Sequence, residues 1–336
     1  MADFRSESNG KGTGGGIPGW VHLVVLGLIV ILIGYGAFRL IKWNKGKDFE
    51  NVEVDESEYE VEMLDQVFLL PAEKRQGHED DGKETILVLG NDAVTYDMSD
   101  DGVCVQIANL TGAEVINAGF GGSTVALSKA EGEGDAMDKF SFYNCAKALT
   151  TGATTEILDA AWTLGDSTLQ QHAQTLCDLD MNTVDTLVIY YDASDYIKLR
   201  PGMNPGDKMD PVTYMGALDS GINMIQEKYP FIRIVCMSFT FCYAYDSDGL
   251  LKNGDRVDFG NGKLTTYLQH MIDTCGETGV SFIDNYYGTI DADNSSGWLL
   301  DNIHVNTACN EYMAQHFTTA IYPGGITSAS DGASDN

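Results

Sequence analysis

The sequence predicts an α/β fold, namely a three-layer, flavodoxin-like domain with a parallel five-stranded sheet, preceded by one transmembrane helix. Five short apolar runs, each bounded by Gly, Asn or Asp, predict the strands; they cover residues 85–90, 114–119, 185–191, 232–239 and 280–285. Helical patterns separate these runs. Strands that are apolar throughout and alternate with helices indicate a parallel sheet that is covered on both faces.

The N-terminal region predicts a membrane anchor. Residues 1–18 are polar and glycine-rich, which is typical of a disordered tail. Residues 20–38 contain no Lys, Arg, Asp or Glu, and a helix of that length rises about 28 Å, enough to cross a bilayer. Trp20 stands at one end of the run and Trp43 lies beyond the other, as expected at membrane interfaces. We therefore expect a transmembrane helix over residues 19–41.

The charges beside this span favour one orientation. Arg5 and Lys11 precede it, whereas four bases follow it: Arg39, Lys42, Lys45 and Lys47. The positive-inside bias alone would keep the C-terminal part in the cytoplasm.

The rest of the chain divides into three predicted regions. Residues 42–83 are expected to form an acidic linker or stalk, because residues 48–65 hold nine acids and no base. The alternation over residues 52–63 would also suit an edge strand. Residues 84–322 form the predicted α/β domain, and residues 323–336 a disordered C-terminal tail.

Composition excludes some classes of function. The chain has 336 residues and a formal net charge of −30, from 50 acids and 20 bases. Such a chain is not expected to bind nucleic acid, because it could not neutralise a run of phosphates. It contains no D-x-D-x-D-G-type calcium loop, and its seven cysteines are spread singly, unlike a disulfide framework or a zinc site. We expect neither a metal nor a cofactor.

Four segments follow the predicted strands or precede the last helix, and they carry the candidate chemistry. They read "LGNDAVTYD", "NAGFGGSTVA", "YYDASDY" and "DNIHVN". Ligands of such sheets bind beyond the C-terminal strand ends. In order and spacing the four segments resemble the four blocks of the SGNH, or GDSL-like, hydrolase superfamily, over roughly residues 84–322. Asn117, Gly119 and Gly122 match its N-x-G-x-x-G block, and Asp301 with His304 match its D-x-x-H block.

The resemblance implies ester hydrolysis by a serine nucleophile, without a cofactor. His304 would be the general base and Asp301 would orient it. The backbone N–H of Gly122 and a side chain from block three, here Ser194, would form the oxyanion hole. Asn117 and Asp195 would contribute to substrate binding.

The first block departs from the family pattern, because its G-D-S reads Gly90-Asn91-Asp92 here. Without a gap, Asp92 takes the place of the serine; with a shift of one residue, Ala93 takes it. In the ungapped register Asp92 would form an ion pair with His304. In the third block Ser194 replaces the oxyanion-hole Asn, although a hydroxyl also donates a hydrogen bond.

Other hydroxyls near these blocks could replace the nucleophile: Thr95, Ser99, Ser123 and Thr124. For Ser123 and Thr124, capping of the following segment is the favoured interpretation. Nucleotide or flavin binding is disfavoured, because the glycine-rich segment lacks the Lys of a phosphate-binding loop.

Two hypotheses therefore remain. In the first, the chain is a membrane-anchored ester hydrolase with an atypical site that acts on the O-acetyl groups of carbohydrate. In the second, it is an inactive relative that binds carbohydrate or acyl groups, or serves as a scaffold, at the cell envelope. Both place the domain outside the cytoplasm, against the charge bias. Aromatic residues within 239–249 and 284–288 are candidates for stacking on sugar rings or for ordinary packing.

Overall fold

The computed structural model describes residues 63–76, 78, 81–130 and 134–326. The predicted disordered tail at 1–18 and the predicted transmembrane helix at 19–41 lie outside these residues, as does most of the acidic segment. Within the described ranges, no helix combines the length and the apolar character needed to cross a membrane.

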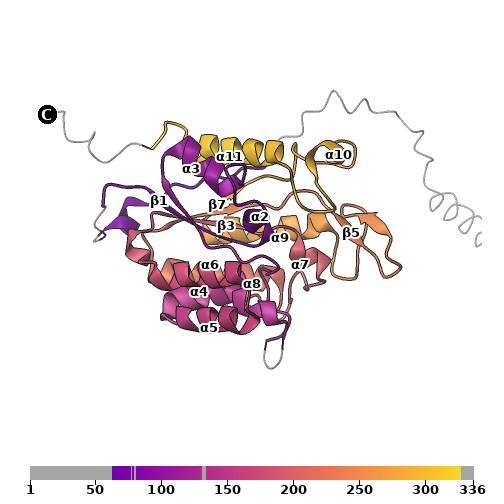
Figure 1. Cartoon of the computed structure of the whole chain (residues 1–336), viewed down its shortest axis with the longest axis horizontal. Coiled ribbons are helices and arrows are strands. Elements are labelled where there is room, and N and C mark those ends of the chain that lie inside the picture. Colours follow the sequence, from indigo (N-terminus) through magenta and orange to yellow (C-terminus); the bar gives the residue numbers. More distant parts are fainter. Residues whose placement is uncertain (1–62, 77, 79–80, 131–133, 327–336) are drawn as a thin grey trace, which may run out of the picture. The chain divides into compact units, whose positions relative to one another are not determined.

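A five-stranded parallel sheet lies at the centre of the domain (Figure 1). Its strands stand in the order β2-β1-β3-β4-β7, which is the flavodoxin-like order. The bounds are β1 Thr85–Gly90, β2 Glu114–Asn117, β3 Thr186–Tyr190, β4 Arg233–Met237 and β7 Ser281–Ile283. The five strands predicted from the sequence are thus confirmed, each to within two residues at either end. All residues of β1 and β3 are buried, as expected for the middle of a covered sheet.

Helices cover both faces of the sheet. On one face α3 (Val103–Thr111) packs against α11 (Thr307–Ile321). On the other lie α4 (Phe142–Thr151), α5 (Thr154–Leu164), α6 (Ser167–Asp178) and α8 (Tyr214–Lys228), and α9 (Leu264–Thr278) packs on α8 (Figure 1). The three-layer architecture is therefore confirmed. The remaining short elements are η2 (Ala72–Arg75), α2 (Asp92–Thr95), η3 (Ala136–Phe140), η4 (Met181–Thr183), α7 (Ser194–Ile197), the β5–β6 hairpin (Tyr243–Tyr245 and Leu251–Asn253) and α10 (Ser295–Trp298).

The helical segment that leads from η3 to β3 consists of three successive helices, α4, α5 and α6. Gly152 ends α4 and Gly165 ends α5, both with left-handed backbone angles of φ 76° and 74°. A residue without Cβ adopts this conformation without strain, which makes it the usual end of a helix. The breaks let the chain fold back, so that α5 packs on both α4 and α6.

The later part of the acidic segment lies along the edge of the sheet. Gln66 pairs antiparallel with Phe282 of β7, and its backbone both donates to and accepts from that residue. Asp65 contacts His316 of α11, with an oxygen–nitrogen distance of 2.7 Å. The structure therefore places residues from about 63 to 70 against the domain, whereas residues 42–62 of the predicted linker lie outside its description.

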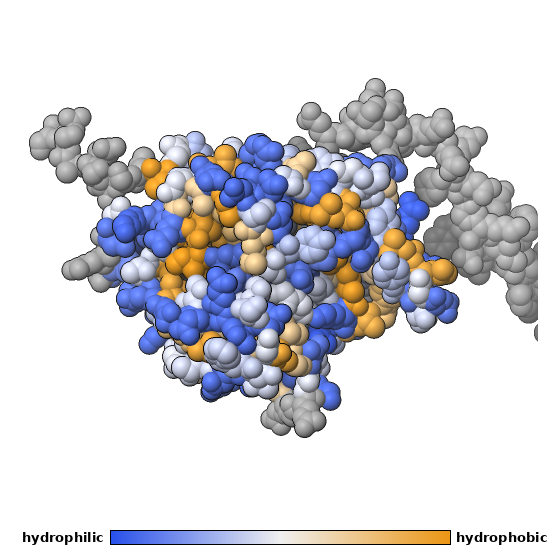
Figure 2. All heavy atoms as spheres, in the orientation of Figure 1, coloured by the Kyte–Doolittle hydropathy of each residue, from blue (hydrophilic) through white to orange (hydrophobic). Residues whose placement is uncertain are grey.

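One face of the domain is mostly hydrophilic (Figure 2), and most of the cysteines are buried. Hydrophilic residues predominate on the face shown in Figure 2, and hydrophobic ones form scattered groups. All seven cysteines are free thiols, and Cys177 is the one that is not fully buried. Burial raises the pKa of the Cys104 and Cys145 thiols to about 12.

Candidate active site

The candidate site lies beyond the C-terminal ends of β1 and β3, where α2 begins. Asn91 connects the two strand ends, because its Oδ1 accepts from the Asp192 N–H at 2.9 Å and its Nδ2 donates to Asp192 Oδ1 at 2.7 Å. The same Oδ1 caps α2 by accepting from the Ala93 N–H at 3.2 Å. Asn91 is fully buried. Asn91 therefore has a structural role, because it holds the two strand ends together. Asp92 is the next residue, and its side chain lines the cavity of the candidate site.

Asp92 lies against the glycine-rich loop that follows β2. Its Oδ2 accepts a hydrogen bond from the Gly122 N–H at 2.7 Å. Gly122 has φ +80°, a conformation that aims its N–H at the carboxylate and that other residues rarely adopt. A Cβ on Gly121 would stand 3.1 Å from Asp92 Oδ1, so the loop approaches this side chain closely. The ungapped register, in which Asp92 takes the place of the family's serine, stays a prediction. The ion pair expected between Asp92 and His304 is not formed, because His304 pairs with Asp301.

His304 and Asp301 form a close pair on the facing loop. His304 Nδ1 lies 2.6 Å from Asp301 Oδ2, and Asp301 Oδ1 accepts from the backbone N–H groups of Ile303 and His304. Partial burial opposes ionisation of Asp301, but the bonds from His304 and Ile303 outweigh it and lower the pKa of this carboxyl. The imidazole stacks on Tyr96 with a centroid distance of 3.9 Å. Both contacts fix the orientation of the ring.

A third side chain, Asp192, completes the cluster. One ligand-type atom from each of Asp92, Asp192 and His304 lies within 4.8 Å of the other two. Asp192 Oδ1 accepts from the Ser194 N–H at 2.9 Å as well as from Asn91. Burial raises the pKa of the Asp192 carboxyl, and the nearby Asp92 carboxylate adds to the rise. The cluster lines a cavity of about 20 Å³.

The remaining predicted site residues serve the loops around this cluster. Asn117 donates to the Val94 carbonyl at 2.7 Å and accepts from the Gly119 N–H at 3.0 Å. Ser194 is nearly buried at 8% exposure, and Ala93 lines the cavity without a polar atom to offer. The substrate-binding role of Asn117 and the oxyanion role of Ser194 stay predictions, because these contacts are all internal to the chain.

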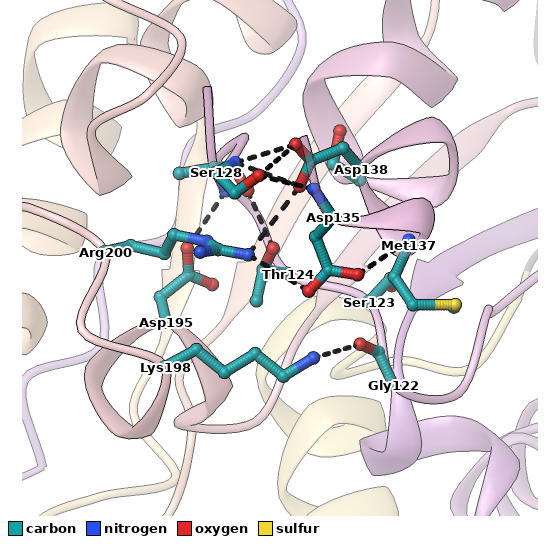
Figure 3. A network of polar contacts seen from close by, with 12 residues as sticks. Gly122, Ser123, Thr124, Ser128, Asp135, Met137, Asp138, Asp195, Lys198 and Arg200 are labelled. Atoms are coloured by element: carbon teal, nitrogen blue, oxygen red, sulfur yellow. Dashed lines mark hydrogen bonds and ion pairs between the residues drawn. The ribbon is translucent and has the colours of Figure 1, made fainter. Parts of the chain in front are cut away.

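Asp195 belongs to a polar network that holds the glycine-rich loop (Figure 3). Its carboxylate accepts from the N–H groups of Val125 and Ala126 at 2.8 and 2.9 Å. Burial raises the pKa of Asp195 to about 6, although both hydrogen bonds and the nearby Arg200 oppose the rise. Lys198, from just beyond α7, donates to the Gly122 carbonyl.

Arg200 ties this network to the segment before α4. Its guanidinium lies 3.6 Å from both Asp135 and Asp138, and Asp138 in turn accepts from Ser128 (Figure 3). The two acids and Asp195 surround one arginine. The loop that carries Gly122 is therefore held from two sides. One side is α7 with the residues that follow it, and the other is the segment at 135–138.

Two site features were missed in the sequence. Asp192 stands where the family pattern has a glycine, and an acid directly after a buried strand was the available signal. Tyr96 follows one helical turn after Asp92, and nothing in the sequence indicated that its ring would meet His304. A larger cavity of about 510 Å³ lies at the opposite end of the sheet, lined by residues such as Lys83, Asp185 and Arg233. It contains none of the predicted site residues.

Comparison with known proteins supports the fold. No family model and no curated protein sequence matches the chain. One solved chain aligns with 74% of this chain and 100% of its own length, at 17% identity and a TM-score of 0.53.

The structural neighbours include chains described as GDSL-like lipases and one described as a carbohydrate acetylesterase, all at low identity. A chain described as a GDSL-like lipase from Bacteroides ovatus aligns with 70% of this chain and 97% of its own length, at 11% identity and a TM-score of 0.43. A carbohydrate acetylesterase from Sinorhizobium meliloti aligns with 69% and 95%, at 11% identity and a TM-score of 0.42. At these identities the likeness is one of fold.

Proposed function

We propose that this protein has lost serine-type ester hydrolysis and uses its GDSL-like fold as a binding module for acylated carbohydrate at the cell envelope. The observation that carries the proposal is the 2.7 Å hydrogen bond from the Gly122 N–H to the Asp92 carboxylate. A carboxylate there takes the donor that an oxyanion would need, and its negative charge opposes a second one. No ester can be attacked by a serine at this position.

The substitute hydroxyls offer no replacement nucleophile. Thr95 donates to the Asn91 carbonyl, Thr124 to the Ala126 carbonyl and Ser99 to Asp97. Ser123 is fully buried, and none of these four residues lines the cavity beside His304. The aliphatic hydroxyl that does line it belongs to Thr240, which is 6% exposed.

A fluorophosphonate probe tests this proposal, because such probes label activated serines. We expect no labelling of the full-length chain. We expect Asp92→Ser to become labelled, because the new hydroxyl faces the oriented His304 and the Gly122 N–H is released. Asp97→Ser is the matched control, since Asp97 lines the same cavity but its carboxylate is turned to Ser99.

Two results would contradict the proposal. Labelling of the unmodified chain that disappears in Ser123→Ala or Ser194→Ala would place a working nucleophile elsewhere. Labelling of Asp97→Ser as strong as that of Asp92→Ser would mean that the register assigned to Asp92 is wrong.

The 2.6 Å pair of His304 and Asp301 favours a second candidate, an atypical ester hydrolase that acts on carbohydrate O-acetyl groups. An oriented imidazole can act as a general base toward water. Initial rates on p-nitrophenyl acetate, compared between the unmodified chain and His304→Gln, separate the two candidates. A hydrolysis rate above background that falls at least tenfold in His304→Gln would favour the hydrolase.

The proposed carbohydrate ligand is supported by few exposed aromatic rings. Phe239, Phe241 and Tyr286 are buried at 4% exposure or less, so they serve packing. Tyr245 is 61% exposed and Tyr96 is 53% exposed, and Tyr96 lines the cavity beside His304, where a sugar could stack on its ring. Tyr96→Ala is expected to weaken binding of O-acetylated oligosaccharide in calorimetry more than Tyr229→Phe, a change remote from the site.

We also propose that residues 19–41 anchor the chain in the membrane and that the domain lies outside the cytoplasm. The charge-free run at 20–38 supports the anchor. Large domains translocate despite flanking bases. Protease added to intact cells is expected to digest the domain, and a domain that survives until the cells are lysed would refute this orientation.

A further inference from the structure

Asp92, Asp192 and His304 form a group whose composition suits a metal ion. One ligand-type atom from each lies within 4.8 Å of the other two. The three come from separate parts of the fold: the start of α2, the loop after β3 and the loop before α11. Two ligands held about 2.1 Å from one ion are about 3–4 Å apart. Side-chain adjustments on the order of 1 Å would therefore bring the three onto one cation.

Hydrogen bonds from residues outside the group hold each of the three side chains, and in Asp92 and His304 the second ligand atom stays free. Asp92 is held through Oδ2 by the Gly122 N–H, Asp192 through Oδ1 by Asn91 and Ser194, and His304 through Nδ1 by Asp301. Asp92 Oδ1 and His304 Nε2 make no hydrogen bond to the described residues, whereas Asp192 is also held by the side chain of Ser194. Metal ligands in proteins are oriented in this way, and a carboxylate on the far nitrogen of a ligating imidazole is the best-known case.

The negative charge of the group also favours binding of a cation. None of the ion pairs among the described residues includes Asp92 or Asp192. Both carboxylates are half-buried, so water screens their mutual repulsion less than at a free surface. The single imidazole already has Asp301 as its partner. Two facing carboxylates without a basic partner are stabilised by a bound divalent ion.

We propose that Asp92, Asp192 and His304 bind one divalent transition-metal ion. One imidazole and two carboxylates suit Mn²⁺ or Zn²⁺, whereas Mg²⁺ and Ca²⁺ prefer oxygen ligands alone. The proposal goes beyond the sequence, whose spacings contain no known metal motif. It rests on the proposed function in one respect, namely that Asp92 is a ligand and not a replacement nucleophile. With three protein ligands, the ion keeps a position for water or for an oxygen of the bound ligand.

Mn²⁺ is the probe of choice, because it avoids binding to the seven thiols. We expect the full-length chain, stripped with EDTA and kept in detergent, to bind one Mn²⁺ in calorimetry and to give the matching loss of free-Mn²⁺ signal in electron paramagnetic resonance. Zn²⁺ should displace it, because Zn²⁺ binds such ligands more tightly. The acidic surface adds weak binding, so the test lies in the variants.

Asp192→Asn removes a ligand charge and is expected to weaken Mn²⁺ binding by about 100-fold or more. Asp301→Asn releases the imidazole from its partner and is expected to cost about 10- to 100-fold. Asp97→Asn, an acid in the same cavity outside the group, is the matched control and should bind Mn²⁺ as the unmodified chain does. His304→Gln offers a second ligand variant if Asp192→Asn unfolds, which circular dichroism would reveal.

Absence of saturable 1:1 binding would overturn the proposal, and so would equal affinity in the unmodified chain, Asp192→Asn and His304→Gln. These outcomes are distinct from failure of the proposed function. That failure is labelling of the EDTA-treated, unmodified chain by a fluorophosphonate, which requires no metal measurement. Binding of Mn²⁺ together with such labelling would keep the metal site and reject the loss of serine chemistry.

Discussion

Asp195 gives the sharpest test of how the site is supported. Its buried carboxylate holds the Val125 and Ala126 N–H groups. Burial raises its pKa from an ordinary value of 3.8 to about 6. The folded protein therefore binds a proton at this group more readily than the unfolded chain does. Its contribution to stability is best at low pH and falls as the pH rises through the window between about 4 and 6.

The size of this effect follows from the two pKa values. Each factor of ten in the ionisation constant corresponds to about 1.4 kcal/mol. The full rise is therefore worth ~3 kcal/mol above the window, and about 2 kcal/mol of it develops between pH 4.5 and 7.5. Asp195→Asn cannot ionise, so the variant lacks this dependence.

Urea unfolding of the full-length chain, followed by circular dichroism at several pH values, measures the effect. The unfolding free energy of the unmodified chain minus that of Asp195→Asn is expected to be about 2 kcal/mol larger at pH 4.5 than at pH 7.5. Asp159→Asn, an exposed acid on α5, is the matched control and should follow the unmodified chain. A difference that stays constant with pH, or that grows toward pH 7.5, would refute the assignment of Asp195 as a buried acid.

Three further outcomes are expected. Gly119→Ala should lower the melting temperature by several degrees, because its Cβ would stand 2.3 Å from Val94 Cγ2. An unchanged melting temperature would show that the loop backbone shifts to accommodate the methyl group. Asp65→Ala should speed proteolytic cleavage near residue 65, because the contact with His316 is lost, and unchanged cleavage would mean that the β-bridge alone suffices. Native alkylation at pH 8 should label Cys177 first, since the other six thiols are buried; mass spectrometry that finds Cys104 modified at an equal rate would contradict their burial.

The sheet could be predicted from the sequence because β1, β3 and β7 are buried throughout and β4 nearly so, which produces apolar runs such as "TILVLG" and "DTLVIYY". The three-residue strands β5 and β6 and the breaks at Gly152 and Gly165 were not predicted. Their signals are local turns inside longer helical or aromatic patterns, and tertiary packing decides which of them the chain uses.

Only some residues of the candidate site could be predicted from the sequence. Asp301 and His304 were singled out because they match the D-x-x-H block that follows the other three segments, and the structure pairs the two side chains. The register left the choice between Asp92 and Ala93 open; in the structure the Asp92 carboxylate accepts from the Gly122 N–H at 2.7 Å, and Ala93 has no polar side-chain atom. Asp192 was missed, because the residue that holds it is Asn91, which follows the neighbouring strand β1. A partner 101 residues away leaves no pattern in one sequence.

The segment around Gln66 has a consequence for association between molecules. A parallel sheet ends in two strands with unpaired backbone groups, and an uncovered edge is a template on which a second chain can add. Gln66 occupies the Phe282 groups on the β7 side with two hydrogen bonds, and Phe68 adds one to the Ser281 hydroxyl. A chain shortened to begin at residue 84 would lose this cover and should form dimers or aggregates. The stretch that looks like a simple spacer therefore covers backbone groups of β7 that would otherwise be open to a second chain.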